Sequence, residues 1–170
     1  MRPQGRAKAG FYPTPPTVTR LIASHIQTES GKPYRFLDPC AGTGTGLKDL
    51  STGFLKSDIQ TFGIELDDVR AAEAKKTLTR CISGDFFTSR TSRRAYSAIL
   101  LNPPYDDTAD EDRRLEHKFL TACKEYLTIG GLLILIIPQV RLIKLTARPL
   151  AAYYDNIKVF RFTDKEYKAF

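Results

Sequence analysis

The sequence is short of cysteine and has no long hydrophobic run. Its three cysteines, Cys40, Cys81 and Cys123, are odd in number and widely spaced, so they form neither a disulfide framework nor a CxxC metal motif. The longest apolar run, residues 132–137, ends at Pro138 and is far shorter than the roughly 20 residues that span a bilayer. No apolar segment follows the basic residues near the N-terminus, so we expect no secretory signal. These absences predict a cytoplasmic protein with free thiols, no membrane association and no bound metal.

Acidic residues are outnumbered by basic ones, 19 to 26, which gives a formal net charge of +7. The composition, 42% hydrophobic and 26% charged, is that of a folded chain, and 170 residues suit one domain. The basic residues gather in three clusters: Arg2, Arg6, Lys8 and Arg20; Arg90, Arg93 and Arg94; and Arg141, Lys144 and Arg148. An acidic segment lies at residues 106–112. Basic clusters bind polyanions, so nucleic acid is a candidate partner, although charge alone does not establish it.

The hydrophobic pattern predicts alternating strands and helices. Strands are expected at 34–37, 60–64, 81–83, 98–101, 132–137 and 157–162, and helices at 17–27, 47–55, 67–79, 112–127 and from about 140, with Asp67 as the N-cap of the helix at 67–79. Gly130 and Gly131 are expected to end the helix at 112–127, and the strand at 132–137 is expected to be buried on both faces. This alternation predicts an α/β fold, a mostly parallel twisted sheet with helices on both faces. In such a sheet the ligand lies at the carboxyl ends of the strands.

A glycine-containing turn follows the first predicted strand, in residues 38–46. Its glycines allow a tight turn and a close approach of the backbone to a ligand. The dinucleotide pattern GxGxxG is absent because Leu47 occupies the place of its third glycine, and no P-loop lysine follows. The turn therefore favours an uncharged or zwitterionic ligand over a pyrophosphate.

Two acidic residues follow the next two predicted strands. Glu65 lies 19 positions beyond Gly46, the spacing at which an acid accepts the hydroxyls of a ribose. Asp85 is followed by Phe86, and an acid beside an aromatic ring suits the amine and the face of an adenine. Each acid alone has a plainer interpretation as a helix cap or a solvated loop charge. Together with the glycine turn they predict an adenosine site without phosphate recognition.

The fourth predicted strand ends in Asn102-Pro103-Pro104-Tyr105. The two prolines restrict the backbone, so the Asn102 side chain and the Pro103 carbonyl are held as two fixed acceptors. Two acceptors can bind both hydrogens of one planar amino or amide nitrogen and direct its lone pair at an electrophile. Tyr105 offers a ring on which a planar group can stack.

These motifs together resemble those of class I S-adenosylmethionine-dependent N6-adenine DNA methyltransferases, in the order of the gamma type. The motifs are residues 11–16, 38–44, 63–65, 84–86 and 102–105. The sequence also resembles small methyltransferase-like proteins of mobile elements and phages. The resemblance implies a Rossmann-like methyltransferase fold, S-adenosylmethionine as the cofactor and DNA as the partner. It also implies direct methyl transfer to N6 of a flipped adenine, without a general base, metal or covalent intermediate.

The resemblance assigns roles to residues of this chain. Tyr12, Thr14 and Pro15 are assigned to the methionine end of the cofactor, and Asp38 and Gly42 to its amino group. Glu65 is assigned to the ribose, and Asp85 and Phe86 to the adenine. The full cofactor set is Tyr12, Thr14, Pro15, Asp38, Cys40, Ala41, Gly42, Gly44, Glu65, Leu66, Asp85, Phe86 and Asn102, and the catalytic set is Asn102, Pro103, Pro104 and Tyr105.

The sequence departs from the family at its C-terminal end. Residues 1–16 form a basic arm with the Tyr-Pro-Thr-Pro segment, and residues 17–170 form a single catalytic domain. The strand at 157–162 could supply one arm of the family's final hairpin, but the second arm and a target-recognition domain are missing. We expect a catalytic fragment of a longer protein; the alternative is specificity from a separate partner.

Other functions remain open on the sequence alone. The Asn-Pro-Pro-Tyr motif also serves methyltransferases that act on adenine in RNA, on N4 of cytosine or on a glutamine amide of a protein. A third class is a non-catalytic module of the same fold that binds the cofactor or nucleic acid.

Overall fold

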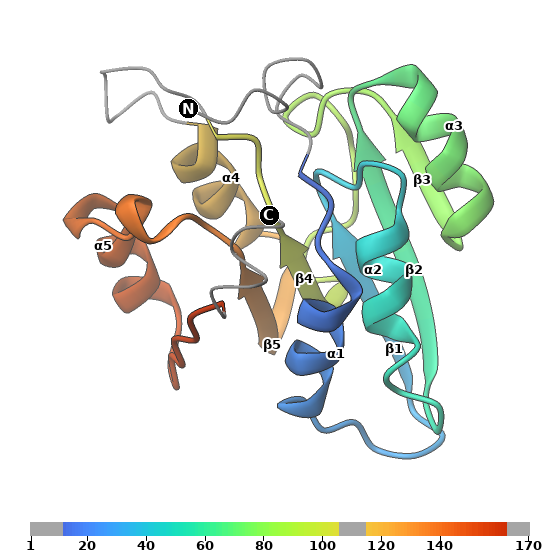
Figure 1. Ribbon diagram of the computed structural model, residues 1–170, viewed down its shortest axis with the longest axis horizontal. Helices are drawn as coiled ribbons and strands as arrows, with labels where there is room; N and C mark the ends of the chain where they lie inside the picture. The colour runs from blue at the N-terminus through green and yellow to red at the C-terminus, as the bar shows by residue number, and fades with distance from the viewer. Residues whose placement is uncertain (1–11, 106–114, 163–170) are drawn as a thin grey trace.

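A computed structural model describes residues 12–105 and 115–162 (Figure 1). Its strands are β1 (Pro33–Asp38), β2 (Asp58–Glu65), β3 (Arg80–Ser83), β4 (Tyr96–Leu101) and β5 (Leu127–Leu135). They form one sheet in the order β3-β2-β1-β4-β5, and every pair is parallel. The predicted α/β sheet is therefore confirmed. The N-terminal part of the basic arm and the acidic segment at 106–112 lie outside the described residues.

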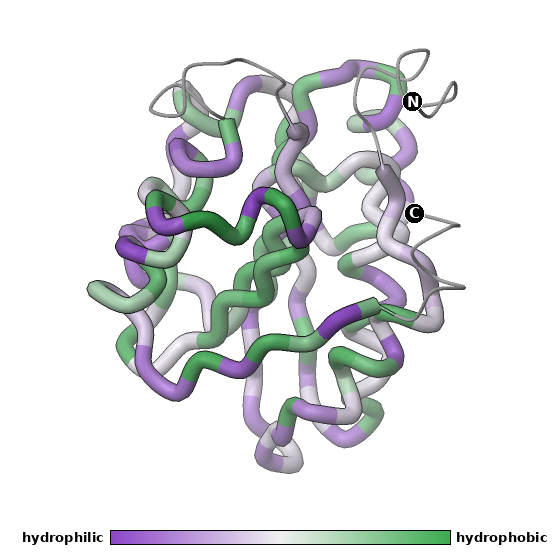
Figure 2. Tube along the Cα trace, turned by 60° about the vertical axis from the view of Figure 1, so that its left-hand side comes forward, coloured by the Kyte–Doolittle hydropathy of each residue, from purple (hydrophilic) through white to green (hydrophobic). Residues whose placement is uncertain are grey.

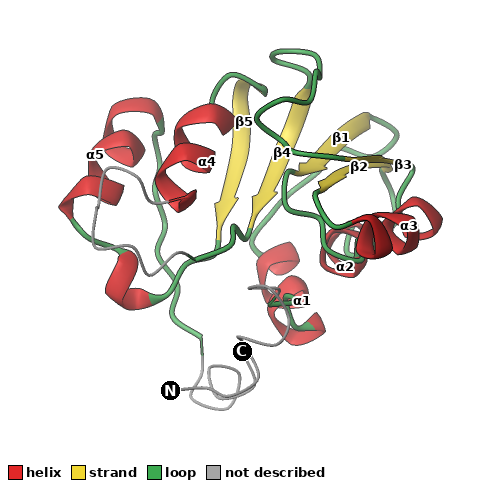
Figure 3. Ribbon diagram, turned by 90° about the horizontal axis from the view of Figure 1, so that it is seen from above, coloured by secondary structure: helices red, strands yellow, loops and turns green. Residues whose placement is uncertain are grey.

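The helices pack on both faces of this sheet. They are α1 (Pro16–Ser24), α2 (Thr45–Ser51), α3 (Asp68–Thr77), α4 (Leu115–Cys123) and α5 (Lys144–Tyr153), with a short 3-10 helix at Gln139–Arg141. Hydrophobic residues are concentrated along the strands inside the molecule (Figure 2). In Figure 3, α4 and α5 lie beside β4 and β5, and α1 to α3 lie on the other side of the sheet.

Each face has its own hydrophobic core. On one side, Leu47 and Leu50 of α2 and Ala74 of α3 pack against Phe36 and Leu100. On the other side, the core contains Phe119, Leu120 and Cys123 of α4 together with Leu37, Ile64, Ile99 and Leu101 of the strands. Alternate residues of β1 and β4 therefore face different helices, which is the arrangement of strands buried on both faces.

The strand order reverses between β1 and β4. Phe36 of β1 pairs with Thr61 of β2 on one side and with Ala98 of β4 on the other. A crevice for a ligand forms at such a reversal, outside the carboxyl ends of the strands. The ends of β1, β2, β3 and β4 all lie at this edge because the strands are parallel.

The start of α3 confirms a sequence prediction. Asp67 is the N-cap, and its side chain accepts a hydrogen bond of 2.9 Å from Arg70 N–H. Such a cap satisfies one of the backbone donors that the first turn of a helix leaves without an intrahelical partner.

The prediction that Gly130 and Gly131 end a helix is wrong. Both glycines lie within β5, at a register shift where Tyr96 pairs with Leu127 but Ala98 pairs with Leu132. The extra residues bulge out of β5, and Gly130 takes the left-handed conformation, with φ of 74°. The strand is also not buried on both faces as predicted: it is the edge strand of the described sheet, and Leu132 is 39% exposed.

The predicted strand at 157–162 is also not observed. These residues have no helical or strand conformation, although the alternating pattern favoured a strand. Their aromatic side chains pack instead on the α1 side, where the Phe160 ring stacks on His25 with centroids 4.5 Å apart. Phe162 packs against the core beneath α1.

Two further features concern the surface. In the described ranges, none of the helices is both long and apolar enough to cross a membrane. The connection from β3 to β4, residues 84–95, contains neither helix nor strand. Most crossovers between parallel strands contain a helix, so this connection leaves part of one sheet face without helical cover.

Candidate active site

The predicted site residues lie at the carboxyl edge of the sheet. Asp38 and Glu65 are the last residues of β1 and β2, and Asn102 directly follows β4. Asp85 begins the turn after β3, where its carbonyl oxygen accepts hydrogen bonds from the N–H groups of Thr88 and Ser89. The fold thus brings four elements of the predicted site to one edge.

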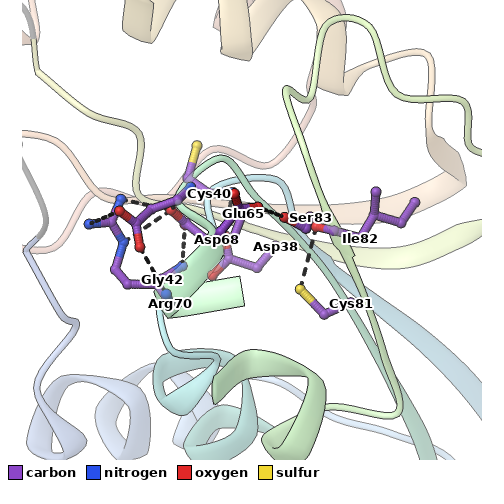
Figure 4. A network of polar contacts seen from close by, with 10 residues as sticks. Asp38, Cys40, Gly42, Glu65, Asp68, Arg70, Cys81, Ile82 and Ser83 are labelled. Carbon is purple, nitrogen blue, oxygen red and sulfur yellow. Dashed lines mark hydrogen bonds and ion pairs between the residues drawn. The ribbon is translucent and has the colours of Figure 1, made fainter. Parts of the chain in front are cut away.

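Glu65 is the centre of a polar network (Figure 4). Its Oε2 accepts a hydrogen bond of 2.8 Å from Gly42 N–H. Its Oε1 accepts from Asp67 N–H at 3.0 Å and from the Arg70 guanidinium, at 3.0 Å from Nε and 2.7 Å from Nη2. The Glu65 side chain is 7% exposed, and Arg70 is 23% exposed. The glycine turn, the end of β2 and the first turn of α3 are therefore joined through one carboxylate.

The sequence prediction missed Arg70. The residue lies five positions after Glu65, and the first turn of α3 brings its side chain back to the end of β2. The Asp67 cap was the signal that could have located this turn.

The glycine turn holds its shape by backbone contacts. Ala41 N–H donates to the Ile64 carbonyl at 3.0 Å, and Gly44 N–H donates to the Ala41 carbonyl at 2.8 Å. Gly42 and Gly44 both have positive φ, 56° and 81°. A Cβ at Gly44 would lie 2.9 Å from the Leu78 side chain and 3.3 Å from the Ala74 backbone of α3, and together with the positive φ these contacts favour glycine here.

Asp38 is buried at the end of β1. Burial is the main reason why the pKa of its carboxyl is raised to about 7, and the nearby negative charge of Glu65 adds to the effect. A hydrogen bond from Cys40 N–H, 2.9 Å long, acts in the opposite direction. Because the described residues supply no other donor to it, this carboxylate is suited to meet a positively charged group.

Cys40 contributes its backbone to the turn and not a reactive thiol. Burial, with a smaller contribution from Asp38, raises the pKa of this thiol well above its ordinary value. A thiol of raised pKa is a poor nucleophile because the reactive form is the thiolate.

Asn102 connects the end of β4 to the N-terminal segment. Its Nδ2 donates to the Tyr12 carbonyl at 2.8 Å and lies 3.3 Å from Thr14 Oγ1. Thr14 is buried, and a Cβ at Gly46 would lie 3.4 Å from its Cβ. Thr14 therefore lies between the glycine turn and Asn102, and Pro15 follows it as the N-cap residue of α1.

The hydroxyl of Tyr105 also contacts Asn102. It lies 2.8 Å from Asn102 Oδ1 and 2.7 Å from the carbonyl oxygen of Ile136. The Tyr105 ring is 6.3 Å from that of Tyr12, centroid to centroid. Burial is the main reason why the pKa of the Tyr105 phenol is raised, so its proton stays on the oxygen. Pro103 is buried between Asn102 and Tyr105, and Pro104 is half-buried.

Of the predicted cofactor residues that follow β2 and β3, Phe86 is placed differently from what its role suggests. Phe86 is only 4% exposed because its ring lies in the core, where it stacks on Phe119, whereas Phe87, whose ring also contacts Phe119, is 45% exposed. Leu66 is 72% exposed beyond the end of β2. The carboxylate of Asp85 accepts a hydrogen bond of 2.9 Å from Phe87 N–H and remains partly exposed.

One basic cluster is partly occupied by an internal ion pair. Arg141 lies 3.4 Å from Glu116 of α4, which is 2% exposed. Lys144 and Arg148 of the same cluster are exposed, as are Arg90, Arg93 and Arg94. The exposed members are therefore the ones available to a polyanion.

The sheet order, the glycine turn after β1 and the acid at the end of β2 are those of a class I methyltransferase fold. A family model matches residues 2–170, and its description is "Uncharacterised methyltransferase family (DUF6094)". The chain belongs to this family. The methyltransferase part of the predicted resemblance is thereby confirmed.

Solved structures support the same fold. A protein of Listeria monocytogenes described as a class I S-adenosylmethionine-dependent methyltransferase matches with a TM-score of 0.69 at 16% identity, over 86% of this chain and 54% of that one. A methyltransferase of Thiobacillus denitrificans, in complex with S-adenosyl-L-homocysteine, matches with a TM-score of 0.52 at 18% identity, over 76% and 51% of the two chains. The chain thus spans about half the length of these two structures. No curated protein matches the sequence.

Proposed function

We propose that this chain is the catalytic part of an S-adenosylmethionine-dependent methyltransferase that methylates N6 of adenine in DNA. The observation that carries the proposal is the bonding of Asn102 to the Tyr12–Thr14 segment. The residue proposed to bind the target amine and the residues proposed to line the methionine end of the cofactor thereby form one connected unit. Methyl transfer needs this proximity, because the two reacting groups must be held in contact and in line.

The residues present fit the proposed cofactor. Asp38 is a buried acid placed to meet a positive charge, which suits the amino group of the methionine moiety. The backbone approach at Gly42 and Gly44 suits the same end of the molecule. Glu65 Oε2 accepts one hydrogen bond in the described structure, so it retains a lone pair for a ribose hydroxyl. We assign the adenine amine to Asp85. The ring that contacts the face of the adenine is then the exposed Phe87, in place of the buried Phe86.

The chain's own contribution to the chemistry lies at the end of β4. When bound, the cofactor supplies an electrophilic methyl group from its sulfonium sulfur. Asn102 Oδ1 accepts one N–H of the target amine through the lone pair that Tyr105 leaves available, and the Pro103 carbonyl accepts the other. These two bonds draw the nitrogen out of conjugation and aim its lone pair at the methyl group. The amine loses its extra proton after transfer, so the chain need not supply a general base.

DNA would be held by the exposed basic residues. Arg90, Arg93 and Arg94 lie on the connection that also carries Asp85, and Lys144 and Arg148 lie on α5. An adenine in a duplex must be flipped out of the stack to reach Asn102. Each phosphate contact would make binding weaker as the salt concentration rises.

The test is transfer of a labelled methyl group from S-adenosylmethionine to separate pools of DNA, RNA and protein. Recovery of N6-methyladenine from the digested DNA is the expected result. Label on cytosine N4, on RNA or on a glutamine amide would assign the site to one of the other planar nitrogens. Cofactor binding without transfer to any pool would contradict the catalytic proposal.

The pH dependence of cofactor affinity tests the assignment of Asp38. Only the ionised carboxylate attracts the cofactor's ammonium group, and the pKa of Asp38 is raised to about 7. We therefore expect affinity to increase about tenfold between pH 6 and pH 8, measured by calorimetry, as the ionised fraction rises. Asp38→Asn should bind more weakly and show no such increase; an unchanged pH profile in this variant would contradict the assignment.

The same substitution should change the pH dependence of stability. The pKa of Asp38 is higher in the folded than in the unfolded chain, so folding favours its protonated form. This contribution is fully present below about pH 4 and is lost as the pH rises through about 7. Asp38→Asn, which cannot ionise, should therefore lose less stability than the wild type between pH 4 and pH 8 in urea denaturation.

A further inference from the structure

A cavity of about 160 Å³ lies on the sheet face opposite α2 and α3. Its lining comes from β1, β2, β3 and β4 and from the helix-free connection at 84–95. None of the residues proposed above for the cofactor or the target amine is in this lining. The cavity is therefore distinct from the proposed cofactor and target-amine sites, and it shares only Arg90 with the basic residues proposed to contact DNA.

The cavity exists because none of the helices in residues 12–105 and 115–162 covers this part of the sheet. Residues 90–92 of the connection close over it instead, and a chain without helical structure cannot fill the space as a packed helix would. An ordinary sheet face of this kind is apolar. Here the strands place Arg35 and Arg80 in the lining, and the connection adds Arg90.

Arg35 is held in a fixed position inside this lining. Its guanidinium carbon lies 4.6 Å from the centroid of the Phe62 ring and 5.3 Å from that of Tyr96, both of which line the cavity. Its Nε is buried and has no hydrogen-bond partner among the residues that the structure describes. A buried donor of a charged group without a partner is costly, and none of the described residues supplies an acceptor to it.

The charges around Arg35 are not neutralised locally. Within the described ranges, neither Arg35, Arg80 nor Arg90 has a carboxylate within ion-pairing distance. Thr91 and Ser92 add hydroxyl groups to the lining, although Thr91 Oγ1 also bonds to the Tyr96 hydroxyl. Three guanidinium groups and two hydroxyl groups thus surround one small space, and none of the described residues that line it is acidic.

We propose that this cavity binds a phosphate group carried as a monoester or as inorganic phosphate. The forked donors of arginine match the oxygens of phosphate, and a dianion balances more of the three positive charges than a single carboxylate does. The volume of the cavity limits the size of the ligand. Pockets for whole small-molecule ligands are about 300 Å³ or more, so 160 Å³ admits a phosphate but not a nucleotide.

This site is independent of the proposed methyl transfer. The cavity would bind phosphate whatever group accepts the methyl. S-adenosylmethionine affinity and phosphate affinity are measured in separate titrations, so a failure of one proposal can be told apart from a failure of the other.

The test is calorimetric titration of the protein with sodium phosphate, compared with sodium chloride at the same ionic strength. Saturable binding of phosphate alone is expected. Arg80 and Arg90 are exposed, so Arg80→Gln and Arg90→Gln should fold normally, and each should weaken phosphate binding about tenfold or more by removing charge-assisted hydrogen bonds. S-adenosylmethionine affinity should stay at the wild-type level in both variants.

The matched control is Arg93→Gln, on the same connection but outside the lining and 79% exposed. It should bind phosphate within about twofold of the wild type, because Arg93 is solvent-screened and lies 3.8 Å from the carboxylate of Glu125. Two results would overturn the proposal: no saturable binding to the wild type, or an equal loss in Arg93→Gln and Arg90→Gln. The second would show a general effect of surface charge.

A second comparison identifies the source of the phosphate. A short single-stranded oligonucleotide with a 5′-phosphate is compared with the same oligonucleotide ending in a 5′-hydroxyl. Tighter binding of the phosphorylated form by the wild type but not by Arg80→Gln would support the site and identify a nucleic-acid end as the source. Equal binding of both forms, with inorganic phosphate still bound, would support the site and identify a small free phosphate.

Discussion

Asn102→Ala is expected to lower the rate of methyl transfer by a factor on the order of 10²–10³, the usual effect of removing one side chain that stabilises a transition state. The variant loses Oδ1, the proposed acceptor for the target amine, while the Pro103 carbonyl remains. The measurement is single-turnover transfer of labelled methyl groups with saturating S-adenosylmethionine, so that weaker cofactor binding does not contribute to the result.

A smaller loss of cofactor affinity should accompany it. Asn102 also bonds to the Tyr12 carbonyl and approaches Thr14 Oγ1, so its removal loosens the N-terminal segment. This loss should be about 1 kcal/mol, the net value of an ordinary hydrogen bond. Tyr105→Phe provides the comparison: it keeps the ring, removes only the hydroxyl that lies 2.8 Å from Oδ1, and should slow transfer far less. A wild-type rate in Asn102→Ala would mean that the motif at residues 102–105 does not form the acceptor site.

Glu65→Ala is expected to lower the free energy of unfolding by about 2–4 kcal/mol. The substitution leaves Gly42 N–H and the Arg70 guanidinium without their shared acceptor in a place that is largely closed to water. The estimate lies slightly below the usual range for a broken buried ion pair, because Arg70 is 23% exposed and can turn toward solvent. Urea denaturation measures the change, and S-adenosylmethionine affinity should fall with it.

Two variants make this result specific. Glu65→Gln keeps the shape and one acceptor oxygen but not the charge, so it should lose less stability than Glu65→Ala. Glu73→Ala removes an exposed acid from the same helix α3 and should change stability by less than about 0.5 kcal/mol. Equal stability of Glu65→Ala and Glu73→Ala would mean that the network around Glu65 contributes nothing to the fold.

The sequence was sufficient where local pattern decides the structure. The strand ends at Asp38, Glu65 and Asn102 followed from apolar runs that stop at polar residues, and Asp67 followed from its place before a helix. The sheet then brings these ends together because all its strands are parallel. Such features depend on neighbours along the chain, which a sequence shows directly.

Features that depend on tertiary packing could not be predicted. The pattern at 157–162 suits a strand, but a strand needs a partner, and these residues instead pack Phe160 on His25. Gly130 and Gly131 resemble a helix end, yet they accommodate a bulge in β5. The two adjacent phenylalanines at 86 and 87 are indistinguishable in sequence, and both rings pack on Phe119, but only Phe86 is part of the buried core.

The position of β1 between β2 and β4 also affects the order in which the chain can fold. β1, β2 and β3 are close in sequence, but β1 meets its other neighbour only when Arg35 and Ser97 come together across 62 residues. Closing so long a loop is slow, and the side of β1 and β2 that carries Leu37 and Ile64 has no cover until β4 and α4 arrive. During synthesis this face of β1 and β2 therefore stays exposed until α4 has been made. A chain that ends before Tyr96 should therefore aggregate rather than form a smaller folded unit.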